Sequence, residues 1–144
     1  MLVTPTCRRR FDKEGKSVNT HGEYPDAIRW VAQKENVPLI ELNGMTTMLC
    51  DALGVDGSMK LYVHYPAGTF PGQTREFKDN SHFSTYGAYE TAKCVVEGMK
   101  KAKLDIVNYL RADYKGFNPA QPDKFETFKW NLCPFTEIEK PDGN

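Results

Sequence analysis

An aspartate and a histidine lie three residues apart in the segment KDNSHFSTYGA, residues 78–88. At this spacing in a turn, the Asp79 carboxylate can accept the Nδ1 proton of His82, which leaves the imidazole Nε2 free. Such a histidine can act as general base toward a hydroxyl nucleophile, while the carboxylate stabilises the imidazolium that forms. The pair is therefore suited to acyl transfer, although a capped turn with a surface histidine would show the same pattern.

The segments on either side of the pair predict how it is positioned. Ser84 can cap a following helix, whose inner apolar face is expected to be Ala88, Ala92, Val95, Val96 and Met99. Residues 54–80 are rich in proline and glycine and predict a long loop with one short element at residues 61–65. Long loops in compact domains are often functional, so the pair is expected in a turn directly before a helix.

The rest of the chain predicts alternating strands and helices. Strands are expected at residues 1–5 and 39–42, and helices at 25–36, 43–54 and 103–113, with Asn43 as a cap and Gly54 as a C-terminal left-handed residue. This order predicts an α/β fold with parallel strands. Because two strands make a poor parallel sheet, further strands are expected before Met1. From Gly116 the tail is expected to be extended and irregular.

A few other polar residues are candidates for binding. Arg8, Arg9 and Arg10 follow the first strand, where open α/β sheets bind ligands, and one of them could pair with a carboxylate; a solvated basic turn is the alternative. His64 is flanked by tyrosines and could line a sugar site or simply cover the core. His21, in a polar loop, is expected to be a surface or capping residue.

The cysteines do not indicate a metal site. They lie far apart in the sequence, with no C-x-x-C pair and no histidine at zinc-ligand spacing, at Cys7, Cys50, Cys94 and Cys133. Buried free thiols are favoured, and a single disulfide remains open. A metal hydrolase built on Asp79, His82 and His64 is poorly supported by this ligand count, so we expect no metal and no cofactor.

The composition fits one soluble domain and excludes some partners. The 144 residues are 40% hydrophobic and carry 19 basic and 19 acidic side chains, with a net charge of zero. That balance argues against nucleic-acid binding. The sequence contains no apolar run long enough for a transmembrane helix and opens with no signal peptide, so no membrane partner is expected.

The segment around His82 resembles the fifth conserved block of SGNH (GDSL) hydrolases, in which Asp-x-x-His is followed by a polar cap and a glycine, here Gly87. The strand at residues 39–42, the helix at 45–53 and the segment 62–70 have the order and spacing seen in rhamnogalacturonan acetylesterases. The stretch VTPTCRR, residues 3–9, also looks like the Thr-Pro-x-x-Arg-Arg segment of their bacterial members. The resemblance covers nearly the whole chain.

The resemblance implies a flavodoxin-like three-layer sandwich, with residues 1–116 as the C-terminal part of an SGNH domain and 117–144 as an extended tail. It implies that His82 is the catalytic base and Asp79 its orienting acid, in an esterase that removes acetyl groups from pectic rhamnogalacturonan. Arg8, Arg9 and His64 would contact this acetylated polysaccharide. A polymer substrate also suggests an exported parent enzyme.

The chain departs from the family pattern at the nucleophile. The Gly-Asp-Ser block and the Gly-x-Asn-Asp block, which supply the serine and the oxyanion donors, are both missing. The nearest match, at residues 56–58, has the order Asp-Gly-Ser and follows a helix. We therefore expect this chain to be nearly inactive alone. Two interpretations remain open: an esterase whose missing N-terminal half carries the serine, or a non-catalytic carbohydrate-binding remnant or pseudoenzyme.

Overall fold

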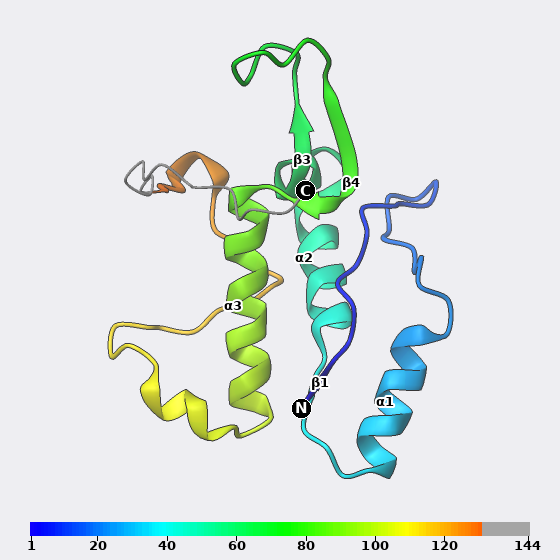
Figure 1. Cartoon of the computed structure of the whole chain (residues 1–144), viewed down its shortest axis with the longest axis vertical. Helices are drawn as coiled ribbons and strands as arrows, with labels where there is room; N and C mark the ends of the chain where they lie inside the picture. Colours follow the sequence, from blue (N-terminus) through cyan, green and yellow to red (C-terminus); the bar gives the residue numbers. More distant parts are fainter. Residues whose placement is uncertain (131–144) are drawn as a thin grey trace, which may run out of the picture.

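The computed structural model describes residues 1–130 (Figure 1). Its elements, in chain order, are β1 Leu2–Val3, α1 Tyr24–Lys34, β2 Leu39–Ile40, α2 Leu42–Gly57, the 3₁₀ turn η1 Ser58–Leu61, β3 Tyr62–Tyr65, β4 Phe77–Phe83, α3 Thr85–Lys101, and the 3₁₀ turns η2 Asp105–Tyr109 and η3 Phe125–Thr127. Within these residues, none of the helices has the length and apolar character needed to cross a bilayer.

The first two strands form a parallel pair. Leu2 lies opposite Leu39 and Val3 opposite Ile40, and α1 connects the two strands. Pro25 stands in the first turn of α1, where its missing N–H costs no helical bond. The predicted α/β character with parallel strands is confirmed, and this sheet has only two short strands in the described part of the chain.

Helix α2 begins earlier than predicted, and Asn43 is not its cap. The cap is Glu41, whose carboxylate accepts the Gly44 N–H at 3.3 Å. Arg29 from α1 fixes that carboxylate through Nε and Nη2 at 2.6 and 2.7 Å, so a residue outside the helix determines where it starts. Asn43 instead bonds to the segment after β1. Gly54 has the expected positive φ of 68°, but the helix kinks there and continues to Gly57.

Helix α3 begins as predicted, but its predicted inner face is only partly buried. The Ser84 hydroxyl accepts the Gly87 N–H at 3.1 Å, which confirms the cap. Of the predicted inner face, Val95 and Met99 pack partly buried against a core cluster, whereas Ala88 and Ala92 are exposed. The most deeply buried positions of α3 are Tyr86, Gly87, Glu90, Thr91, Lys93, Cys94 and Gly98. The two glycines let α3 approach its neighbours closely: a Cβ at Gly87 would lie 1.8 Å from the Leu61 carbonyl oxygen.

The predicted long loop is largely a β-hairpin. β3 and β4 pair antiparallel and project beyond the ends of α2 and α3, which run side by side (Figure 1). The short element expected at residues 61–65 is confirmed as β3. The strand β4 was missed, because its sequence FKDNSHF is mostly polar and its residues are mostly exposed. Asp79 and His82 therefore lie within a strand.

The segment after α3 is less helical than predicted. Only the 3₁₀ turn at Asp105–Tyr109 forms where a helix at 103–113 was expected, and Lys103 has a φ of 53°, which ends α3. The tail is irregular as far as residue 130, and its prolines at 134 and 141 lie outside the described residues. Lys93 and Tyr86 of α3 hold the tail at Asp123, whose carboxylate and carbonyl oxygen they contact at 2.7 and 2.6 Å.

Three cysteines are buried free thiols, as favoured by the sequence. Cys7 and Cys50 lie in a core cluster with Leu49, Leu61, Tyr62 and Tyr86. Their sulfurs are 3.2 Å apart and both face the Tyr62 hydroxyl. Cys94 packs separately with Ile40 and Leu42, and Cys133 lies outside the described residues.

Candidate active site

Asp79 and His82 occupy an irregularity in the β3–β4 hairpin. Tyr62 pairs with Phe83 and His64 with Lys78, so residues 79–82 of β4 bulge out opposite a single residue of β3. Inside the bulge, one carboxylate oxygen of Asp79 accepts the backbone N–H groups of Ser81 and His82 at 2.6 and 2.9 Å. The turn expected around the pair is thus present, but inside a strand.

The remaining carboxylate oxygen of Asp79 orients the histidine. It lies 2.6 Å from Nδ1 of His82, and because a carboxylate only accepts, Nδ1 carries the proton. No described residue hydrogen-bonds to Nε2, and the His82 side chain is 81% exposed. The backbone N–H groups of His82 and Ser81, followed by the His82 ring, lower the pKa of Asp79 to about 2. An ionised carboxylate behind an accessible imidazole is the arrangement of a general base.

The described residues place no nucleophile beside His82. Ser58, in the Asp-Gly-Ser look-alike, is fully buried; its hydroxyl donates to the Val55 carbonyl and accepts from Arg9. Ser84 donates to the Lys60 carbonyl while it caps α3. Among residues 1–130, no hydroxyl or thiol is hydrogen-bonded to His82. The described residues therefore offer His82 no hydroxyl or thiol partner.

Two of the predicted substrate-binding residues meet at a residue that sequence reasoning missed. His64 Nε2 lies 2.8 Å from the Asn80 side-chain oxygen, and Arg9 Nη1 donates to the same oxygen at 3.3 Å. Arg8 is exposed and has no side-chain bond to any described residue. His21 contacts the Thr6 carbonyl at 2.8 Å, in keeping with the expected structural role. The only sequence signal for Asn80 was its place between the two members of the pair.

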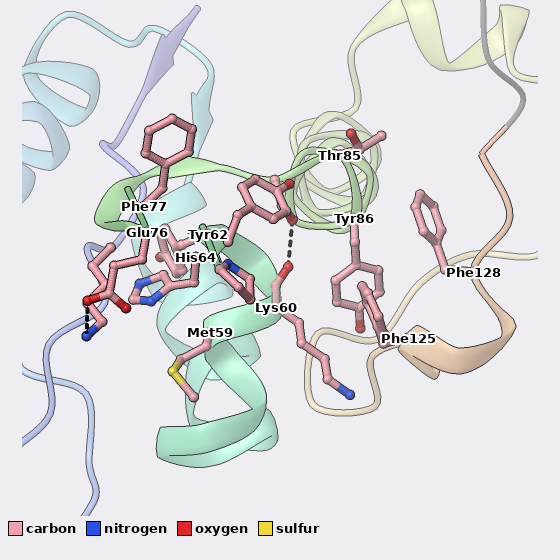
Figure 2. A pocket seen from close by; sticks show the side chains of 14 residues that line it. Met59, Lys60, Tyr62, His64, Glu76, Phe77, Thr85, Tyr86, Phe125 and Phe128 are labelled. Carbon is pink, nitrogen blue, oxygen red and sulfur yellow. Dashed lines mark hydrogen bonds and ion pairs between the residues drawn. The ribbon is translucent and has the colours of Figure 1, made fainter. Parts of the chain in front are cut away.

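A cavity of about 580 Å³ lies beside the hairpin. Figure 2 shows His64, Tyr62 and Phe77 on one side of it and Tyr86, Phe125 and Phe128 on the other. Aromatic faces of this kind suit the apolar face of a sugar ring. His64 thus links the cavity wall to Asn80, whereas Asp79 and His82 do not line the cavity.

Comparison with known proteins finds two relatives that are named as acetylesterases. It is 39% identical over 110 residues to rhamnogalacturonan acetylesterase RhgT of Bacillus subtilis (strain 168), and 28% identical over 110 residues to the probable rhamnogalacturonan acetylesterase YesY of the same organism. The matches cover 76% of this chain but 47% and 46% of those proteins, so the chain spans about half the length of the curated relatives it matches. No family model and no solved structure matches the chain. The resemblance found in the sequence is therefore confirmed: this is an SGNH-type, rhamnogalacturonan acetylesterase-like chain that corresponds to part of those proteins.

Proposed function

We propose that this chain carries the general base and orienting acid of a serine esterase that removes acetyl groups from rhamnogalacturonan. His82 takes the proton of a serine hydroxyl through Nε2, and Asp79 stabilises the imidazolium that results. The observation that carries the proposal is the 2.6 Å contact between His82 Nδ1 and the Asp79 carboxylate, with Nε2 exposed. The names of the two relatives support the reaction and the substrate.

The serine and the oxyanion donors are proposed to come from an N-terminal half outside these 144 residues. In the proposed enzyme, this half completes a flavodoxin-like three-layer sandwich by adding strands to the β1–β2 pair. Without a nucleophile and oxyanion donors, a His/Asp pair retains little catalysis, since removing one member of a triad costs several orders of magnitude in turnover. The chain alone is therefore expected to be nearly inactive.

Hydrolysis of an aryl acetate tests this proposal. The purified chain is assayed alone and after addition of the N-terminal half of the 39%-identical relative. We expect activity only in the mixture, and we expect His82→Ala to abolish it. His21→Ala should retain it, because the His21 ring contacts the Thr6 carbonyl and makes no hydrogen bond to the pair. Ester turnover by the chain alone that is lost in His82→Ala would contradict the proposal.

The same assays also test the competing interpretation, a non-catalytic carbohydrate-binding module. No turnover in either assay, together with cooperative unfolding and measurable binding to pectin, would favour a non-catalytic carbohydrate-binding module. The cavity beside His64 is where such binding would be sought.

Arg8 is proposed to contact the polymer. Its guanidinium is exposed on the loop that also carries Arg9, and galacturonate offers the carboxylate that a guanidinium can bind in a bidentate way. Arg8→Ala is expected to raise KM for acetylated rhamnogalacturonan while leaving hydrolysis of a neutral aryl acetate unchanged. An equal loss on both substrates would contradict a role in polymer binding.

A further inference from the structure

The Asp79–His82 pair has few contacts of its own to the rest of the molecule. Within the described part of the chain, every hydrogen bond of its two side chains stays inside residues 79–82. The side chains of His82 and Asp79 are 81% and 37% exposed. A loop held only by local, solvent-exposed bonds opens readily, because little free energy opposes its conformational entropy. A general base needs a defined position, so the bulge requires an external attachment.

That attachment is Asn80, the residue that follows Asp79. Its side-chain oxygen lies 2.8 Å from His64 Nε2 on β3 and accepts Arg9 Nη1 at 3.3 Å. Its backbone carbonyl accepts the Arg9 N–H at 2.9 Å. Two segments distant in sequence therefore fix both the side chain and the main chain of one bulge residue.

Both partners of the Asn80 side chain identify the same atom, the amide oxygen, as the acceptor. Arg9 can only donate, so the atom of Asn80 that it contacts is the amide oxygen. The same oxygen faces His64 Nε2, which must then carry a proton. A short neutral amide satisfies both donors without placing a second carboxylate beside Asp79.

Arg9 connects this arrangement to the core. Its Nη2 donates to the Val55 carbonyl at 2.6 Å, just after the kink in α2, and its Nε donates to Ser58 at 3.2 Å. Ser58 is fully buried at the start of η1. The path from the packed end of α2 through Arg9 to Asn80 consists of direct hydrogen bonds only.

We propose that Asn80, held by Arg9 and His64, is the positioning residue that fixes the Asp79–His82 pair. The importance of this positioning for catalysis rests on the proposed function, whereas the positioning itself can be tested in this chain alone. Arg9 and His64 act on the base through Asn80.

The test is the titration of the Asp79 carboxyl carbon by NMR in the full chain. The pKa of Asp79 is lowered to about 2 by bonds that exist only when the bulge is ordered, so this pKa reports the geometry directly. Asn80→Ala removes the anchoring amide without changing any charge. Ser81→Ala is the matched control, because the Ser81 contact to Asp79 is made by its backbone N–H, which alanine retains.

We expect Asn80→Ala to raise the pKa of Asp79 from about 2 toward the ordinary value of 3.8, and Ser81→Ala to leave it unchanged. An unchanged pKa in folded Asn80→Ala would overturn the proposal. If Asn80→Ala does not unfold cooperatively, His64→Phe takes its place, because it removes the Nε2 donor and retains an aromatic ring. The pKa of Asp79 must then rise in His64→Phe.

A kinetic measurement then tests whether the positioning of the pair by Asn80 contributes to catalysis. In the reconstituted esterase, Asn80→Ala is expected to lower kcat roughly 10- to 100-fold with little change in KM for an aryl acetate. A rise in the Asp79 pKa without any esterase activity in the wild-type mixture would sustain the positioning claim and count against the proposed function. A raised pKa with an unchanged kcat would overturn the positioning role in catalysis.

Discussion

Substituting Gly87 with alanine measures how closely α3 must approach the segment before β3. An added Cβ would lie 1.8 Å from the carbonyl oxygen of Leu61 and 2.6 Å from its carbonyl carbon, whereas real Cβ atoms keep at least 3.0 Å. The obstructing atoms belong to the backbone, so no side-chain rotation can relieve the clash. The Leu61 carbonyl also accepts the Ser84 N–H at 2.9 Å, so moving α3 away breaks a bond that lies two residues after His82.

The size of the effect follows from two opposing contributions. Overpacking against well-packed atoms costs typically 1–3 kcal/mol, and a rigid backbone neighbour favours the upper end, about 3 kcal/mol. Alanine in place of glycine inside a helix recovers about 1 kcal/mol. The net loss in the free energy of unfolding is therefore about 2 kcal/mol, which lowers Tm by roughly 6 to 8 °C for a chain of this size.

Urea-induced unfolding, followed by circular dichroism, measures this difference. Gly44→Ala is the matched control: its Cβ would meet only the Glu41 side chain, at 3.7 and 3.8 Å, so helix propensity should stabilise that variant by ~0.5 kcal/mol. Opposite signs for the two glycine substitutions are expected. A Gly87→Ala chain as stable as wild type, with an unchanged m-value, would refute the close approach of α3.

Three further predictions concern the titratable groups. Oxidised glutathione added during refolding, when both thiols are accessible, should join Cys7 and Cys50 in a disulfide and release two glutathione thiols, because the two sulfurs lie 3.2 Å apart in the fold and the hydrogen bond with Cys50 lowers the pKa of Cys7. Thiol titration of the refolded chain that still detects both groups would contradict this. The folded structure lowers the pKa of Asp79 from 3.8 to about 2, so the ionised carboxylate should stabilise the fold fully above pH 3.8 and lose this effect as the pH falls through 2. The difference in unfolding free energy between wild type and Asp79→Asn should therefore shrink between pH 3.8 and pH 2. Lys93→Met removes the ammonium 2.7 Å from the fully buried Glu90 and should cost about 3 kcal/mol at neutral pH. Burial raises the pKa of Glu90, so protonation should reduce this cost near pH 4, and equal costs at both pH values would argue against a buried charge.

The sequence predicted only part of the candidate site: the contacts between residues close in the chain, and not those between distant residues. The contact between Asp79 and His82 spans three residues, and the turn that makes it is closed by neighbouring N–H groups. Local chemistry of this kind can be deduced from residue order. The contact between Arg9 and Asn80 spans 71 residues, and no local pattern indicates it. For this reason the sequence did not indicate the contacts of Arg9 and His64 with Asn80, and Asn80 was not singled out.

The sequence by itself determined the helix signals that depend on neighbours in the chain. The helix expected from residue 25 has Pro25 in its first turn, and the Ser84 hydroxyl caps α3 as predicted. Both signals depend only on residues within a few positions in the chain. The parallel pairing of the two short strands also followed, since a helix connects them.

The tertiary structure alone decided which faces meet. Ala88 and Ala92 have helical spacing as good as that of the buried positions, yet α3 turns Gly87 and Gly98 inward, because only residues without a Cβ fit against Leu61 and Ile40. The strand β4 likewise exists because β3 supplies its hydrogen-bond partners, and its polar sequence gave no period of two. Burial and strand pairing depend on distant residues, whereas caps and turns depend on adjacent ones.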